Sequence, residues 1–364
     1  MKTRTTARDA VVDQALEVLA GLLPVGWKID RDRGPAGDED RVGLVVEDPS
    51  SVSQSILADV QPSASPMELQ RAYPRSIDEQ LPSDLDDPVL VVARYLSPRS
   101  RIVLDEASVN YLDLTGNVRL TVRSPGLAIL AEGAQRDPTP RVRPDRGIAG
   151  PAAGRIVRAL ADTAPPYSVS ELASLAGVSV GYCSRTLQAL EREALIERDG
   201  RGTVRRVDWP NMLRRRGAAV PLFDPRRTTT YIARSGVRGA MDLLVGIDAD
   251  SYAITGSFAA ARIRAVAASV GLVLYTSRPD RLAASLDLLP ADQGADVSLI
   301  VPADDGVFTG SSIAEGNRWV APSQIVVDCY GGSGRMPQEG EAVLEWMIED
   351  EDEWRSRRTE AGIQ

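Results

Sequence analysis

Histidine is absent from this sequence, and lysine and cysteine are almost so. The 364 residues include no histidine, two lysines (Lys2 and Lys28) and two cysteines. The lack of histidine excludes Ser-His-Asp and Cys-His catalysis, histidine-ligated zinc and the most common general base. Two cysteines do not form a disulfide framework and favour a reducing compartment, so we expect a cytoplasmic location.

Long hydrophobic runs are also missing. No run of eighteen apolar residues occurs, so no membrane span is predicted. The first stretch, MKTRTTARDAVVDQALEVLAGLLP, carries Asp9 and Asp13 ahead of its apolar part and has no small-residue cleavage site. It therefore predicts an amphipathic helix and not a signal peptide.

Positive charge is almost entirely arginine, and it is concentrated in the middle of the chain. Residues 141–216 contain fourteen arginines and eight acidic residues, a balance of +6, within a chain of formal charge −9. The remainder therefore carries −15. The arginine guanidinium makes bidentate contacts with phosphates and with guanine edges, although a GC-rich genome would give the same bias towards arginine. The asymmetry favours one nucleic-acid-facing module in an otherwise acidic protein.

Composition divides the chain into three parts. The Pro/Arg/Gly-rich stretch 138–154 predicts a linker, and a second break lies near 212–227. We predict an N-terminal α/β domain over 1–140, a central winged helix-turn-helix over 147–213 and a C-terminal α/β domain over 220–364.

The central part has the spacing of three helices. GRIVRALADT (154–163) carries apolar residues at helical intervals. In the next segment, 168–178, Glu171 follows Ser168 by three residues, as a capping box requires. Ser179 can cap a third helix that runs to about Glu193.

This third helix is amphipathic, and a hairpin follows it. Cys183, Leu187 and Leu190 form its apolar stripe. Arg185 lies on the opposite face. The sequence LIERDGRGTVRRV (195–207) predicts two short strands around a tight turn. We expect Cys183 to be a core residue, with a redox sensor as the alternative.

The stretch SVSELASLAGVSVGYCSRTLQALEREALIERDGRG resembles the winged-helix modules of bacterial regulators. The resemblance implies that the helix after Ser179 lies in the major groove of double-stranded DNA, and that the hairpin meets the backbone or the minor groove. The DNA-binding residues expected are Ser179, Tyr182, Arg185, Gln188, Arg192, Arg198, Arg201, Arg205 and Arg206. A winged helix used for protein contacts is the alternative, because four acidic residues lie among these arginines.

The N-terminal part predicts strands at 41–48, 55–61 and 88–98, a helix at 99–110, and strands within 111–122 and 126–133. This order has some likeness to restriction-endonuclease-like folds. Those nucleases require an acid followed by an acid-x-Lys motif, which holds a metal and activates water.

The N-terminal acids do not complete that nuclease motif. Asp59 is the candidate, with Glu47 or Asp48 before it, but Gln61 stands where the lysine is needed. We therefore predict no metal site and no enzymatic activity. Asp113 and Asn117 are either catalytic or part of a turn, and the turn is the favoured interpretation.

A second resemblance covers ARYLSPRSRIVLDEASVNYLDLTGNVRL (93–120). It is similar to a segment of AbiEi-family antitoxins and related helix-turn-helix regulators, in which such a block lies beside a winged helix. The resemblance implies an antitoxin-like autorepressor and a regulatory or partner-binding C-terminal domain. In AbiEi proteins, however, the winged helix is N-terminal, whereas here it follows an α/β domain.

The C-terminal part predicts strands at Tyr252–Thr255, Leu272–Tyr275 and Val297–Val301, another strand within 318–335, and a terminal acidic helix. Gly256-Ser257 after a strand is similar to the Gly-Ser motif of nucleotidyltransferases. The Asp-x-Asp motif with which those enzymes bind two metal ions does not follow it.

The sequence therefore predicts a sequence-specific DNA-binding transcriptional regulator that acts as a homo-oligomer, most simply a homodimer, without a cofactor. A toxin or a small-molecule effector is a possible further partner that the sequence does not identify. The alternatives are a nucleic-acid-processing enzyme with a degenerate nuclease-like domain and a protein-interaction scaffold.

Overall fold

The computed structural model describes residues 2–32, 41–61, 64–74, 88–138, 148–266, 268–269 and 271–356, with the side chains of residues 2–8 excepted. It contains two compact units. The first comprises residues 1–144 and 192–194, and the second comprises residues 145–191 and 195–364. Most of the predicted linker, 139–147, lies outside the described residues, and its last residues belong to a helix. Across the described ranges, no helix combines the length and the apolar character needed to cross a membrane.

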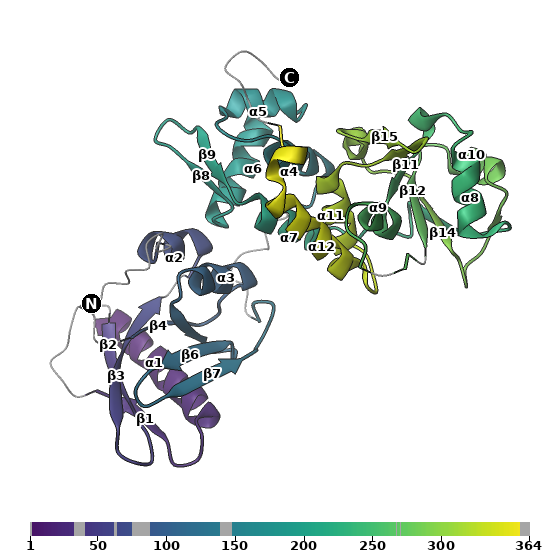
Figure 1. Cartoon of the computed structure of the whole chain (residues 1–364). Helices are drawn as coiled ribbons and strands as arrows, with labels where there is room; N and C mark the ends of the chain where they lie inside the picture. Colours follow the sequence, from purple (N-terminus) through teal and green to yellow (C-terminus); the bar gives the residue numbers. More distant parts are fainter. Residues whose placement is uncertain are drawn as a thin grey trace. The chain divides into compact units, whose positions relative to one another are not determined.

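The first unit is built on one seven-stranded sheet whose strands follow in sequence order (Figure 1). The β3–β4 and β4–β5 pairs are parallel and the other pairs are antiparallel. The strands are β1 (Lys28–Arg31), β2 (Arg41–Glu47), β3 (Ser53–Gln61), β4 (Val89–Ala93), β5 (Asn110–Asp113), β6 (Val118–Val122) and β7 (Leu127–Ala131).

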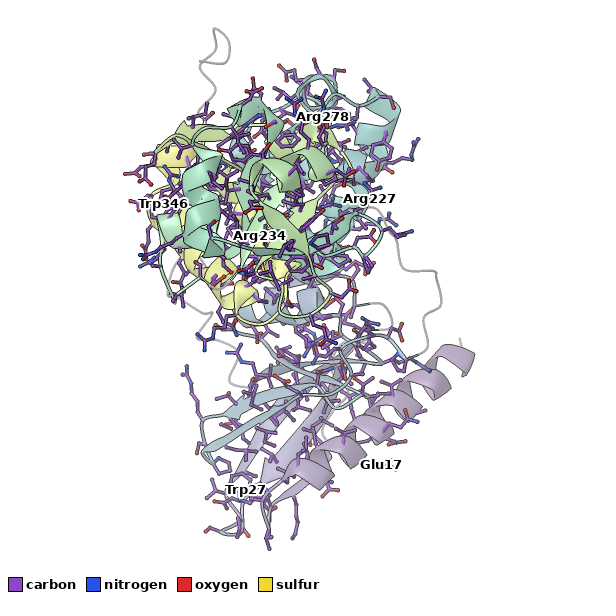
Figure 2. All side chains as sticks on the ribbon, turned by 90° about the vertical axis from the view of Figure 1, so that its right-hand side faces the viewer. Glu17, Trp27, Arg227, Arg234, Arg278 and Trp346 are labelled. Carbon is purple, nitrogen blue, oxygen red and sulfur yellow. The ribbon has the colours of Figure 1, made fainter. Side chains whose placement is uncertain are left out.

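Helices cover both faces of this sheet. Helix α1 (Lys2–Leu22) buries Leu19 in the same cluster as Val92, while Glu17 lies on its exposed face (Figure 2). Helices α2 (Pro66–Ala72) and α3 (Pro98–Glu106) share a second cluster with Val91. Because neighbouring residues of a strand point to opposite faces, α1 lies on one side and α2 and α3 on the other. The N-terminal amphipathic helix is therefore present as predicted.

Two of the candidate acids of the incomplete nuclease motif, Glu47 and Asp59, are separated in this sheet. Asp59 is paired with Arg41 of β2, whereas Glu47 is paired with Ser53 at the other end of the same ladder. Six residues of strand span about 20 Å. Asp59 instead accepts hydrogen bonds from Gln61 Nε2 (2.9 Å) and from the Tyr73 hydroxyl.

Asp113 organises the turn after β5. It accepts hydrogen bonds from the backbone amides of Leu96 (2.9 Å) and Thr115 (2.9 Å) and from the side-chain amide of Asn117 (Nδ2, 2.8 Å), so it holds the turn together. Within the described ranges no three His, Cys, Asp or Glu side chains come together as metal ligands would.

The second unit begins with the winged helix. Its elements are α4 (Pro151–Asp162), α5 (Val169–Leu175), α6 (Val180–Arg192), β8 (Ile196–Arg198), β9 (Val204–Val207) and α7 (Trp209–Ala219).

A seven-stranded mixed sheet follows, in the order β13-β10-β14-β12-β11-β16-β15. Its strands are β10 (Thr228–Ala233), β11 (Ala253–Thr255), β12 (Leu272–Tyr275), β13 (Leu288–Pro290), β14 (Val297–Ile300), β15 (Ser312–Ala314) and β16 (Asn317–Trp319). Its helices are α8 (Gly236–Leu244), α9 (Gly256–Ile263), α10 (Pro279–Ser285), α11 (Pro322–Tyr330), α12 (Met336–Glu349) and α13 (Glu351–Trp354), with 3₁₀ turns at Ala249–Ser251 and Asp305–Phe308.

One continuous hydrophobic core joins the winged helix to this C-terminal sheet. Helix α11 packs against α4, α7, α9 and α12 (Figure 1). Gly217 on α7 approaches α11 so closely that a Cβ there would lie 2.4 Å from the Tyr330 Cβ. The predicted break at 212–227 instead contains the second half of α7 and lies inside one compact unit.

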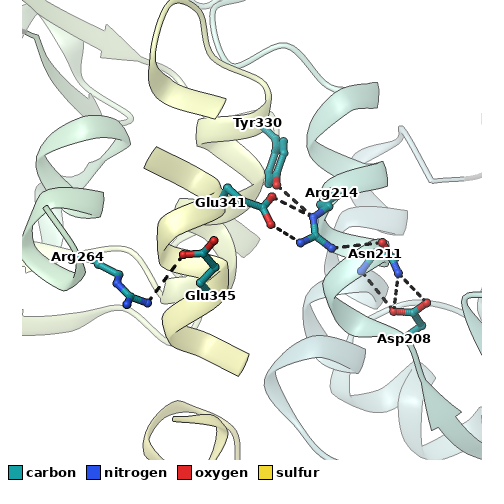
Figure 3. Close-up of polar contacts among 7 residues, drawn as sticks. All are labelled: Asp208, Asn211, Arg214, Arg264, Tyr330, Glu341 and Glu345. Carbon is teal, nitrogen blue, oxygen red and sulfur yellow. Dashed lines mark hydrogen bonds and ion pairs between the residues drawn. The ribbon is translucent and has the colours of Figure 1, made fainter. Parts of the chain in front are cut away.

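Polar contacts reinforce the same junction (Figure 3). Arg214 of α7 pairs with Glu341 of α12 and donates to the Tyr330 hydroxyl (3.2 Å). Asn211 and Asp208 continue this network at the start of α7.

The strand predicted within 318–335 extends only to Trp319, and the apolar run that follows is helix α11. Pro322 begins the helix at the position where proline is favoured. All residues from Ser323 to Cys329 are buried, so the run lacks the amphipathic period of a surface helix. The predicted acidic terminal helix corresponds to α12 and α13.

Candidate nucleic-acid interface

Helices α4, α5 and α6 form a helix-turn-helix whose turn is fixed by local hydrogen bonds. Ser168 and Glu171 make the predicted capping box at the start of α5, with Ser168 N donating to Glu171 Oε2 (2.8 Å). Gly177 has φ +59°, a left-handed conformation that glycine adopts at low cost. Ser179 Oγ then accepts a hydrogen bond from Tyr182 N (3.3 Å) and caps α6.

Helix α6 has one buried and one exposed face. Its predicted apolar stripe, Cys183, Leu187 and Leu190, is fully buried. The predicted residues Ser179, Arg185, Gln188 and Arg192 are exposed, and Tyr182 is half-buried on the flank. The structure therefore brings these five residues together on and beside one surface, defined from here on as the recognition face.

Arg185 extends over the recognition face from the middle of α6. Its guanidinium carbon lies 5.9 Å from the centroid of the Tyr182 ring, within range of a cation–π contact. None of the described carboxylates forms an ion pair with it. Its charge is therefore available to a phosphate or a guanine edge.

Val180 is an exposed apolar residue at the start of α6 that sequence reasoning missed. Its side chain is 51% exposed at the first position of α6. An apolar side chain at this place in a helix-turn-helix can contact a thymine methyl group. Val180 precedes Cys183 by three residues and Leu187 by seven, so it continues the apolar stripe beyond the core, and its exposure could not be read from the sequence.

Strands β8 and β9 form the predicted wing. Asp199 holds its turn, because its carboxylate accepts hydrogen bonds from Thr203 N (3.0 Å) and Arg201 N (2.9 Å). The Thr203 amide, followed by the Arg205 guanidinium, holds the pKa of Asp199 below its usual value. Gly202 in the same turn has φ +84°.

The wing arginines differ in their availability. Arg198 pairs with Glu191 and is only 16% exposed. Arg205 pairs with Asp199 (2.8 Å) and Arg206 with Glu197 (2.9 Å), and both remain about half exposed. Arg201 is exposed at the turn and has no ion pair with the described residues. These ion pairs were invisible in the sequence because they join β8 to α6, β8 to β9, and the turn to β9.

Cys183 lies at the centre of the winged-helix core. Burial raises the pKa of its thiol to about 11, so the reactive thiolate is scarce near neutral pH. Both Cys183 and Cys329 are free and buried. The structure places Cys183 where a core residue was expected.

Comparison with protein families identifies this part of the chain. Residues 153–200 match the IclR helix-turn-helix domain. The match runs from α4 through α6 into the wing and supports a DNA-binding transcriptional regulator. No curated protein and no solved structure matches the chain. The resemblance to AbiEi antitoxins is not shown by these comparisons.

Proposed function

We propose that this protein is a sequence-specific transcriptional regulator that inserts α6 into the major groove of double-stranded DNA. The observation that carries the proposal is the recognition face, where Arg185, Gln188 and Arg192 are exposed on a helix whose other face is buried. Early residues of such a helix lie at base edges, and arginine pairs with guanine there.

The wing supplies contacts to the DNA backbone. Arg201 is available without rearrangement, whereas Arg205 and Arg206 must exchange their carboxylate partners for phosphates. Arg198 is the least accessible of the four. The proposal therefore assigns base recognition to α6 and a positioning role to Arg201, Arg205 and Arg206.

The test begins with selection of bound duplexes from a random library, since the operator is undefined. The selected duplex and a scrambled duplex are then titrated at several salt concentrations. Arg185→Ala is expected to weaken binding to the selected duplex by about 1–3 kcal/mol. Arg201→Ala is expected to weaken both duplexes equally and to lower the salt slope by about one unit.

Arg278→Ala is the matched control, because Arg278 is an exposed arginine of the C-terminal part, away from the winged-helix elements (Figure 2). It should leave both affinities unchanged. Failure to enrich any duplex, or an Arg185→Ala variant with parental affinity, contradicts the proposal. In that case a winged helix used for protein contacts, which the three ion pairs of the wing favour, becomes the better assignment.

We also propose that the protein binds as a homodimer and represses its own promoter, as the AbiEi-like segment 93–120 suggests. Dimeric helix-turn-helix proteins bind half-sites about one DNA turn, or a multiple of it, apart. Footprinting on the promoter and light scattering of the complex test both points. One protected half-site with one bound chain contradicts the dimer. A partner toxin would be encoded by a neighbouring gene and would co-purify with this protein.

Our proposal gives the chain no catalytic role. The separation of Glu47 from Asp59 and the contacts of Gln61 support this for the first unit. Metal-dependent nicking of plasmid DNA that is lost in Asp59→Ala would restore the enzyme alternative.

A further inference from the structure

A cavity of about 290 Å³ opens within the second unit, between the winged helix and the C-terminal sheet. Helix α4 contributes Arg155 and Arg158, α7 contributes Arg216, and α11 contributes Asp328. The segment 220–227 and the residues after β14 complete the wall. A cavity of this size accommodates a small metabolite.

The cavity wall is positively charged and partly apolar. Five arginines and three aspartates line it, and the apolar part includes Val157, Leu222 and Val307. Two of the aspartates already have arginine partners, as Asp304 pairs with Arg155 and Asp224 pairs with Arg226. The third, Asp328, accepts hydrogen bonds from Thr255 (2.6 Å), Gln324 (2.8 Å) and Tyr275 (2.9 Å).

Arg216 is the cation of this wall that lacks an anion. Its guanidinium donates to the carbonyl oxygens of Ile148 and Gly150 (3.1 Å), and no described carboxylate lies within ion-pair distance. Burial lowers the pKa of this guanidinium, and the charge of Asp328, which opposes that shift, acts on it without an ion pair. A ligand anion beside it would therefore be stabilised, and a carboxylate matches the fork of an arginine.

The same cavity wall is attached to the helix-turn-helix. Arg155 Nε donates to Ala176 O (2.8 Å) and its terminal nitrogen donates to Gly177 O (3.2 Å). Both carbonyls belong to the turn that precedes α6. The guanidinium that pairs with Asp304 of the C-terminal part therefore also fixes the turn before the recognition face.

We propose that this cavity binds a small organic carboxylate with an apolar body, whose carboxylate pairs with Arg216, and that its occupancy alters DNA affinity through Arg155. The second half of the proposal rests on the proposed DNA-binding function, whereas the first half does not. The bound carboxylate competes with Asp304 for Arg155. The hydrogen bonds from Arg155 to the turn before α6 are then weakened.

Ligand binding is tested with the full chain in the absence of DNA. The probes are benzoate, phenylacetate and hexanoate, each compared with its uncharged amide by calorimetry up to about 10 mM. At least one acid is expected to bind saturably and at least tenfold more tightly than its amide. This ratio of affinities is the effect expected of one ion pair between a carboxylate and a guanidinium.

Two variants locate the site. Arg216→Gln is expected to weaken acid binding about tenfold or more, while Arg215→Gln, a neighbour on α7 outside the cavity wall, leaves it unchanged. Ala303→Leu fills the cavity from an exposed position without removing charge, so it should block binding even if Arg216→Gln folds poorly. The proposal is overturned if no acid binds, if acids and amides bind equally, or if Ala303→Leu binds as the parent does.

The coupling is tested on the selected duplex. The bound acid is expected to change DNA affinity about fivefold or more in the parent, and not in Arg155→Gln. An unchanged DNA affinity with proven acid binding overturns the coupling and leaves the ligand site standing. If the proposed DNA-binding function is wrong, the protein fails to bind the duplex even without the acid. This outcome is therefore distinguished from a failure of the acid to bind.

Discussion

Arg205 and Arg206 share their guanidinium groups with Asp199 and Glu197 across the wing. Each arginine that reaches a phosphate leaves a carboxylate behind, close to the negatively charged duplex. The net electrostatic attraction of the wing is therefore smaller than its number of arginines suggests.

Removing one of these carboxylates should strengthen binding to any duplex. Glu197→Gln frees Arg206 and adds one unit of positive charge, so affinity for the scrambled duplex is expected to rise several-fold and its salt slope to steepen by about one unit. Fluorescence anisotropy at several salt concentrations measures both. Glu345→Gln on α12, which removes one acidic charge beside Arg264 (Figure 3), is the control and should change neither.

Asp328 makes the stability of the second unit depend on pH. Burial raises the pKa of its carboxyl from 3.8 to about 6, against the hydrogen bonds that favour its charge. The folded protein thus binds this proton more tightly than the unfolded chain. The contribution of Asp328 is fully favourable below pH 4 and is lost as the pH rises through 6.

The Asp328→Asn variant removes this titration. Its unfolding free energy, relative to the parent, is expected to increase by about 1 kcal/mol between pH 5 and pH 7. Urea unfolding followed by tryptophan fluorescence measures it in a Trp27→Phe background, since the four other tryptophans belong to the second unit. A pH-independent difference between variant and parent would show that Asp328 titrates normally.

At the scale of elements, short-range signals were the ones that predicted structure correctly. The capping box at Ser168 and the stripe of α6 involve residues three or four positions apart, and both are present. Helix α11 was not predicted, since only a strand was expected within 318–335, because its β-branched residues are buried all round and leave no period. Strand β1, with four residues, was not predicted at all.

The capping box should contribute measurably to the stability of the helix-turn-helix. Ser168→Ala removes the acceptor of the Glu171 amide and is expected to lower the unfolding free energy of the second unit by about 1 kcal/mol. Ser174→Ala, an exposed serine within the same helix, should be nearly neutral. Equal effects from the two substitutions would mean that the cap does not stabilise α5.

At the scale of the whole molecule, the sequence predicted more divisions than the structure has. The composition change near 212–227 suggested a break between domains, yet Met212 and Leu213 are buried in the core that joins α7 to the C-terminal part. The cavity was missed for the same reason. Its wall assembles Arg155, Arg216 and Asp328 from segments far apart in the sequence, and no local pattern reports such proximity.

This shared core predicts that the winged helix and the C-terminal part lose structure together. Leu344→Ala on α12 removes a fully buried side chain and is expected to cost about 2–5 kcal/mol. Hydrogen exchange should then accelerate in α5 and α6 as well as in α12. Leu120→Ala, equally buried in the first unit, should leave exchange in α6 unchanged. Acceleration confined to α12 and its neighbours would contradict a common cooperative unit.

The close approach at Gly217 and Gly331 limits how this protein can be engineered. A Cβ at Gly331 would lie 2.3 Å from Val220 O, so the backbones there interlock without room for a side chain. A chimaera joined between residues 213 and 220 would cut through this seam and leave apolar surface on both halves. A winged helix from another protein should therefore be grafted only together with its own matching α11. Alternatively, the fusion point should precede Ile148, so that the winged helix and the C-terminal part are transferred together.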